Sequence, residues 1–316
     1  MKLPEKDRVD YSASGRIDLL LPAQGTGRRL DQALADLLPQ HSRNRLQEWI
    51  RAGRVALNQQ PELEPKKKVF GGERLSVDPA VDVAVLIGQA EEIPLTIVFE
   101  DESLLVIDKP AGLVVHPGSG NWSGTLMNAL LHHVPGIDAI PRAGIVHRLD
   151  KDTSGLLVVA KTLEAQTDLV RQLQARTVKR QYLAVAGGAV IKDQVIDAPI
   201  GRHPVQRTRM AVVAGGKPAI THVRILARLR GACLIECSLE TGRTHQIRVH
   251  LAHIGHALLG DPVYGRVNKA LPAFPRQALH ATRLGLIHPH RRVAMQWEAS
   301  MPEDMQALLR DLKVGD

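Results

Sequence analysis

Aromatic residues and cysteines are both scarce in this chain of 316 residues. Phe, Trp and Tyr occur three times each, fewer than expected of a protein that holds single-stranded RNA mainly by aromatic stacking. The two cysteines, Cys233 and Cys237, share one apolar run, and their spacing along a strand is too long for an easy disulfide. The sequence therefore excludes a disulfide scaffold and indicates two reduced thiols in a core.

Long apolar runs are absent as well. No run approaches the roughly 20 residues that cross a membrane. The first residues are charged, unlike the start of a secretory signal. We therefore expect a cytoplasmic protein without a membrane partner, and a chain of this length most often forms two domains.

The usual motifs for nucleotide binding, serine hydrolysis and metal binding are missing. No Gly-rich phosphate loop, dinucleotide fingerprint or Gly-x-Ser-x-Gly run occurs. His245, His250, His253 and His256 lie close together, but no acidic residue or cysteine lies among them. We expect structural or RNA-contacting histidines rather than a metal site, and a carboxylate that acts without an obvious cofactor.

Positive charge is concentrated in two zones of the chain, whose formal net charge is +8. Eight Lys or Arg and one acid lie between Thr241 and Arg292, and ten basic and seven acidic residues lie between Thr26 and Asp78. A solvated basic face is one explanation. A nucleic-acid partner is favoured, because basic zones attract polyanions and arginine planes also stack on bases.

The first basic zone predicts a small folded unit over residues 16–80, after a mobile tail over 1–15 and before a linker over 81–92. Two short helices are expected, one from the spacing of Leu30, Ala33 and Leu34, the other containing Trp49. The unit resembles the S4-type RNA-binding module; the alternative is an ordinary helical hairpin packed on the second domain. Its expected RNA-binding residues are Arg43, Arg45, Arg51, Lys66, Lys67 and Lys68.

The second domain is expected over residues 93–316. Patterning predicts strands near 95–99, 104–108, 182–185, 222–225, 234–238 and 296–299. It predicts helices near 124–132, 163–174, 245–253 and after Pro302.

Asp150 lies in the run Gly144-Ile-Val-His-Arg-Leu-Asp-Lys-Asp-Thr-Ser-Gly155. We expect strands at Ile145-Val146 and Leu156–Ala160, with this carboxylate at the corner between them. Flanking cations favour an ionised carboxylate, which suits a nucleophile or a charge stabiliser better than a proton donor. A surface cluster of ion pairs is the alternative.

A second run, Thr241-Gly-Arg-Thr-His-Gln-Ile-Arg248, places cations and backbone N–H groups at the start of an expected helix. Such a position suits an anion. Arg243 is expected to bind phosphate or to neutralise a carboxylate such as Asp150. A capped helix with a surface arginine is the alternative.

Several motifs in order identify a resemblance. Residues 146–155 resemble the signature of the RluA family of RNA pseudouridine synthases. Residues 106–118, 180–185 and 241–248 resemble its first motif, the strand with its active-site tyrosine, and its basic motif. Softer matches, including Arg207–Ala211 and Arg276–Ala281, lie closest to the ribosomal large-subunit synthase D branch. Gln181 departs from the branch, where an acidic residue is common before the tyrosine.

The resemblance implies an α+β fold: an S4-like domain, then a catalytic domain on a mostly antiparallel mixed sheet flanked by helices and loops. It implies an isomerisation of uridine to pseudouridine, with no cofactor, in a stem-loop of large-subunit ribosomal RNA or of a pre-ribosomal particle. Asp150 would be the essential catalytic residue and Arg243 would pair with it. Tyr182 would pack against the flipped uracil and could remove the C5 proton. Arg148 would fill the space of the expelled base, and further expected RNA contacts are His147, Thr153 and Arg248.

Two other functions remain open at this point. A ribosome-associated binder explains the charge but leaves Asp150 without a purpose. A glycoside-type hydrolase usually needs a second carboxylate as general acid, and the sequence offers no obvious one. A monomer is the expected state, and the atom that Asp150 attacks stays open.

Overall fold

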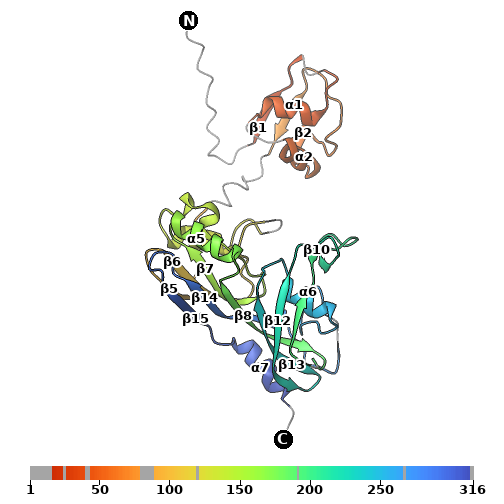
Figure 1. Ribbon diagram of the computed structural model, residues 1–316. Helices are drawn as coiled ribbons and strands as arrows, with labels where there is room; N and C mark the ends of the chain where they lie inside the picture. The colour runs from red at the N-terminus through yellow and green to blue at the C-terminus, as the bar shows by residue number, and fades with distance from the viewer. Residues whose placement is uncertain are drawn as a thin grey trace. The chain divides into compact units, whose positions relative to one another are not determined.

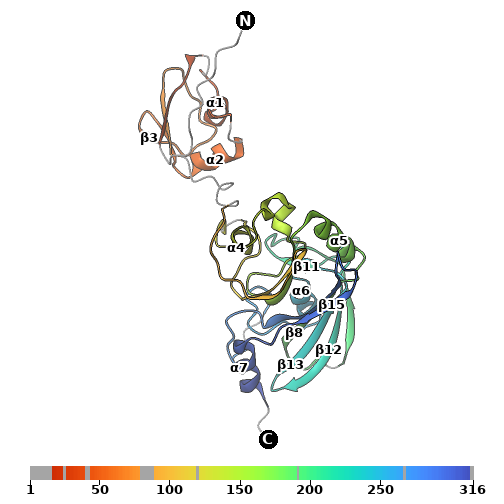
Figure 2. The ribbon, with the colours of Figure 1, turned by 90° about the vertical axis from the view of Figure 1, so that its left-hand side faces the viewer.

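The computed structural model describes residues 16–23, 26–39, 43–78, 89–118, 121–190, 192–265 and 268–313, without the side chains of Asn44 and Arg45. The chain divides into two compact units between Ile87 and Gly88 (Figures 1 and 2). The expected tail over 1–15, most of the expected linker over 81–92 and the side chain of Arg45 lie outside the described residues.

The N-terminal unit packs two helices on a small antiparallel sheet. Its strand order is β1-β4-β2-β3, with α1 (Leu30–Leu37) and α2 (Arg43–Arg51). The strands are β1 (Ile17–Leu20), β2 (Val55–Leu57), β3 (Gln60–Pro61) and β4 (Arg74–Val77). Leu30, Leu34 and Ile50 are fully buried in one core, so the helical spacing in the sequence marks the inner faces.

The C-terminal unit, residues 88–316, is called the catalytic unit after its expected role and is built on one mixed sheet of nine strands. Among the described strands of this sheet, only β7 and β14 pair in parallel, at Ser154 with His280 and at Gly155 with Ala281; the other pairings are antiparallel. The expected mostly antiparallel mixed sheet is therefore confirmed. In order, the strands are β5 (Ile97–Glu100), β6 (Leu104–Lys109), β7 (Ser154–Ala160), β14 (Leu279–Ile287), β8 (Lys179–Gly187), β13 (Ala232–Leu239), β12 (Ile220–Leu229) and β9 (Gln194–Asp197), and β15 (Ala294–Glu298) pairs with β14.

Helices cover both faces of this sheet. The core that contains Leu157 and Val159 of β7 also contains residues of α4 (Leu126–His133) and α6 (Gln246–His253). The alternate β7 residues pack with α5 (Leu163–Gln174) in another core, and α7 (Glu303–Leu312) packs with a third. Figure 1 shows α6 beside β12 and near the short hairpin of β10 (Ile200–Arg202) and β11 (Met210–Val212).

One expected strand is wrong. Ile145 makes only an isolated bridge to Val159, because the preceding residues 141–144 form a 3-10 turn in which Arg142 has a positive φ. The run toward Asp150 is therefore irregular.

Cys233 and Cys237 are free and buried in the core, as expected. Within the described part of the chain, no helix is long and apolar enough to cross a membrane.

Candidate active site

A cavity of about 860 Å³ opens on the catalytic unit around Asp150. Its walls include the turn that carries Asp150, the start of β8, and the residues from Leu239 to Arg248, with further contributions from the end of α5, from His116 and Pro117, and from Leu279 of β14. Segments far apart in the sequence therefore meet at one carboxylate.

A buried lysine is hydrogen-bonded to the backbone of the turn that carries Asp150. Lys109 is fully buried, and its Nζ donates to the carbonyl oxygens of Pro110, Leu113 and Lys151 at 2.7, 2.9 and 3.0 Å. Burial lowers the pKa of Lys109 to about 8, although the charges of Asp152 and Asp150 oppose this. The residue after Asp150 is thus fixed to the end of β6.

Gly155 allows the same turn to approach β14 closely. Its φ is +110°, and a Cβ there would lie 2.2 Å from the carbonyl oxygen of Ala281. A side chain at this position would therefore push β7 away from β14.

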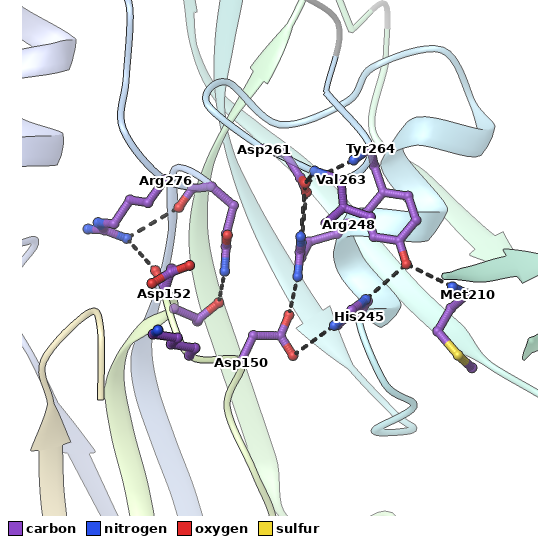
Figure 3. Close-up of polar contacts among 12 residues, drawn as sticks. Asp150, Asp152, Met210, His245, Arg248, Asp261, Val263, Tyr264 and Arg276 are labelled. Atoms are coloured by element: carbon purple, nitrogen blue, oxygen red, sulfur yellow. Dashed lines mark hydrogen bonds and ion pairs between the residues drawn. The ribbon is translucent and has the colours of Figure 1, made fainter. Parts of the chain in front are cut away.

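Asp150 faces two basic side chains (Figure 3). Its Oδ2 accepts a hydrogen bond from Nη1 of Arg248 at 2.9 Å, and its Oδ1 lies 3.9 Å from Nε2 of His245. The side chain of Asp150 is 16% exposed, whereas that of Arg248 is 5% exposed. The carboxylate of Asp150 is therefore accessible from the cavity, whereas the guanidinium of Arg248, its counter-charge, is buried.

Arg248 is shared between two carboxylates. Its Nε and Nη2 donate to Asp261 at 2.7 and 2.9 Å, which leaves Nη1 for Asp150. Burial alone would raise the pKa of Asp261, but the hydrogen bonds and charge of Arg248 outweigh it and hold that pKa below its usual value. Asp261 thus fixes the plane of the guanidinium that holds Asp150.

The expected pairing of Arg243 with Asp150 is wrong. Nε of Arg243 donates to the carbonyl oxygen of Pro218 at 3.0 Å, and among the described residues the ion pairs of Asp150 involve Arg248 and His245. The reason is the position of the helix start: α6 begins at Gln246, so Arg248 lies in its first turn and Arg243 precedes it. Arg243 still lines the cavity.

His245 precedes α6 in the left-handed conformation, with φ 56°. Its Nδ1 lies 2.9 Å from the hydroxyl oxygen of Tyr264, which also accepts the backbone N–H of Met210 at 3.0 Å. Burial lowers the pKa of His245, although Asp150 opposes this. Figure 3 shows the resulting chain of contacts from the β10–β11 hairpin to Asp150.

Tyr182 and Arg180 lie two residues apart on β8, so they point to the same face. Both line the cavity, and both are more than nine-tenths buried. Burial raises the pKa of Tyr182, with Arg180 opposing and Asp150 adding to the shift. Tyr182 is therefore a neutral phenol at rest.

The structure separates the expected RNA-contacting residues of this unit. Arg148 is exposed and lines the cavity, as an RNA contact requires. Nε2 of His147 accepts the backbone N–H of Val158 at 3.1 Å, and burial lowers the pKa of His147 to about 3. Thr153 is 2% exposed and accepts from Gln277. Thr153 and Arg248 are buried in the protein but line the cavity, so their expected RNA contacts stay predictions.

The basic residues of the N-terminal unit also differ from one another. Arg43 donates to the buried carboxylate of Asp31, and Lys67 pairs with Glu62. All five described candidates are exposed, and the other three are Arg51, Lys66 and Lys68. Arg43 therefore supports the fold of its own unit through Asp31.

Sequence reasoning missed several residues of the site, namely Lys109, Arg180, His245 and Asp261. The only signal for Asp261 was its being the single acid in a basic zone. Among the described residues, no group of His, Cys, Asp and Glu could hold a metal ion. Both ring nitrogens of His250, for example, form hydrogen bonds, Nδ1 with the hydroxyl of Thr221 and Nε2 with the carbonyl oxygen of Ala198.

Comparisons with known proteins agree with this geometry. The family model described as RNA pseudouridylate synthase matches residues 103–253, and the S4 domain model matches residues 28–75. Ribosomal large subunit pseudouridine synthase D of Nitrosomonas europaea is 58% identical over 97% of this chain and 92% of its own length. The chain belongs to the RluA family of RNA pseudouridine synthases.

Other relatives in the family give the same result. The protein of the same name from Yersinia pestis is 53% identical over 91% of both chains. The solved structure of human RNA pseudouridylate synthase domain containing 1 superposes with a TM-score of 0.55 at 25% identity, covering 72% of this chain and 99% of the human one. As a member of this family the chain is an isomerase with an N-terminal S4 domain.

Proposed function

We propose that this protein converts specific uridines to pseudouridine in a stem-loop of large-subunit (23S) ribosomal RNA, as a cytoplasmic monomer. Its relatives, which are ribosomal large subunit pseudouridine synthases, supply the substrate class. The observation that carries the proposal is Asp150, a carboxylate open to the cavity and held from behind by the buried Arg248. Its target is RNA or the pre-ribosomal particle.

The environment of Asp150 suits a nucleophile or charge stabiliser. The hydrogen bond from Arg248 holds Oδ2 of the carboxylate in place and leaves Oδ1 directed toward His245. Because the reaction breaks the bond to C1′ of the ribose, a fixed negative charge at this place stabilises the electron-deficient sugar.

A hydrolase with paired carboxylates is disfavoured by the same cavity. Besides Asp150, the only acidic side chain among its described lining residues is Glu240. Hydrogen bonds and charges from His222 and Arg176 lower the pKa of Glu240, so it is a poor proton donor. Asp261 is fully buried in its pair with Arg248. The site therefore lacks a general acid of the glycosidase kind.

The target base must leave the RNA stack to reach Asp150, at a cost of a few kcal/mol. Exposed Arg148, two residues before Asp150, is placed to occupy the vacated space and offset that cost. Tyr182 would pack against the flipped uracil. Since its phenol is neutral at rest, packing suits it better than proton removal.

The decisive test replaces Asp150 with Asn or Ala and follows tritium release from C5-labelled uridine in 23S RNA. We expect both variants to be inactive. Asp152→Asn is the matched control, because it removes an acid from the same turn whose side chain does not line the cavity, and it should retain activity. Turnover by Asp150→Ala at a rate near that of the parent protein would refute the role of Asp150.

A further inference from the structure

Arg180 is a buried cation that has no counter-charge among the described residues. Its side chain is 7% exposed overall, and it forms no ion pair with any described residue. Its one hydrogen bond there runs from Nη2 to the backbone carbonyl of Glu240 at a long 3.3 Å, and its Nε has no partner. Leaving a buried charge this poorly satisfied is costly, so the arrangement calls for a function.

The surroundings keep Arg180 in place and unpaired. A Cβ at Gly242 would lie 2.7 Å from its Nη1, so the missing side chain leaves room for the guanidinium. The carboxylate of Glu240 is turned to Arg176 and His222 instead. Burial lowers the pKa of Arg180, as expected of a cation that has lost water without gaining an anion.

Two buried parts of the cavity lining differ in charge. At Asp150, one guanidinium, Arg248, lies between two carboxylates, so this part carries an excess negative charge. Arg180 lies in the same lining without a counter-charge among the described residues, on the same face of β8 as Tyr182. An anion formed in this cavity is repelled from Asp150 and attracted to Arg180.

The reaction forms such an anion. When the bond between C1′ and N1 breaks, its electron pair stays on the base, and the charge of the departing uracil spreads over N1, O2 and O4. C5 then bonds to C1′, the C5 proton is lost and one proton returns to the base, so no atoms are gained or lost. We propose that Arg180 is a further catalytic residue, which donates hydrogen bonds to a carbonyl oxygen of the departing uracil.

This role rests on the proposed function and is more specific than binding RNA. Phosphates are permanently charged and are met by more accessible cations of the lining, such as the exposed Arg148 and the half-buried Arg243. A cation sealed beside Tyr182 interacts most strongly with charge that develops deep in the cavity during the reaction. Its contribution should therefore appear in the rate of the chemical step rather than in RNA affinity.

The test compares Arg180→Met, Arg180→Lys and the parent protein in single-turnover reactions with saturating enzyme and an RNA that the parent protein converts. We expect Arg180→Met to react about 100- to 1000-fold more slowly, by analogy with the loss of one oxyanion donor. RNA affinity and its salt dependence should stay close to those of the parent protein. Arg180→Lys, which keeps the charge, should be intermediate.

The matched control is Arg283→Met. Arg283 lies on the adjacent strand β14 and also has an unpaired Nε, but it pairs with Glu298 and does not line the cavity. Its removal should leave the rate unchanged.

Chemical rescue keeps the test independent of folding defects. Added guanidinium at sub-denaturing concentration should accelerate Arg180→Ala, whereas sodium chloride of equal ionic strength should not. Loss of affinity and a lower salt slope with an unchanged single-turnover rate would instead identify a phosphate contact and overturn the proposal, as would an unaltered rate. Failure of the parent protein on 23S RNA would refute the proposed substrate, and the Arg180 comparison would still stand on any uridine that the parent protein converts.

Discussion

Replacement of Lys109 by Met should change how the stability of the catalytic unit depends on pH. Lys109 is fully buried, and its pKa is lowered from 10.5 to about 8, mainly by desolvation. Below pH 8 the lysine is charged in both the folded and the unfolded chain. Between pH 8 and 10.5 the unfolded chain binds more protons, so the free energy of unfolding rises with pH; above 10.5 both forms are neutral.

The difference between the two pKa values corresponds to about 3 kcal/mol. Lys109→Met lacks this titration. The free energy of unfolding of the parent protein should therefore rise by about 3 kcal/mol relative to that of the variant across this pH range. The offset at neutral pH also includes the three carbonyl oxygens that lose their donor. The pH dependence of the difference in free energy of unfolding is therefore the measurement that isolates the titration of Lys109.

Urea unfolding followed by tryptophan fluorescence gives this slope. A Trp49→Phe background leaves Trp122 and Trp297, both in the catalytic unit, as the reporters. Lys151→Met removes an exposed lysine from the neighbouring turn, and its curve should run parallel to that of the background protein. A difference between Lys109→Met and the background that stays constant from pH 8 to 10.5 would refute the reasoning.

Three further predictions concern activity and binding. Arg248→Gln leaves the carboxylate of Asp150 and the buried carboxylate of Asp261 without their cation, so it should abolish turnover and destabilise the catalytic unit by roughly 3–5 kcal/mol. Tritium release and urea unfolding measure the two effects, and a stable, active variant would contradict the pairing. Arg148→Ala should slow conversion of stacked uridines but not of a substrate in which the target uridine already lies opposite an abasic site. Equal losses of rate on both substrates would contradict the proposal that Arg148 occupies the space left by the flipped base. Deletion of residues 1–87 should weaken RNA binding and reduce its salt slope while the catalytic unit stays folded, and an unchanged slope would exclude phosphate contacts by the S4 domain.

Local chemistry made several elements predictable. The helix over 163–174 has its expected bounds, because Thr162 caps it with a hydrogen bond to the N–H of Ala165 and an apolar stripe follows at helical spacing. Cys233 and Cys237 are core thiols because they alternate inward on β13. These features depend on residues that are close together in the sequence, so a single sequence is enough to predict them.

Features set by distant parts of the chain were not predictable. The run over 279–287 was not expected to be a strand, yet it is β14 at the centre of the sheet. The partner of Asp150 is 98 residues away, and the choice between Arg243 and Arg248 depends on the residue at which α6 begins. The lack of a described counter-charge for Arg180 has no sequence signature, because it depends on where side chains from distant parts of the chain point in the folded protein.

The parallel pairing of β7 with β14 has a consequence for the synthesis of this protein. Ser154 Oγ and His280 Nδ1 lie 3.0 Å apart although 126 residues separate them in the chain. At typical translation rates, β14 follows β7 out of the ribosome only after about ten seconds. Until then β7 and β8 expose unpaired edges. An mRNA truncated before the codon for residue 279 would therefore yield an inactive, protease-sensitive chain rather than a weak enzyme, because the segment that follows Asp150 would lack its contacts with β14.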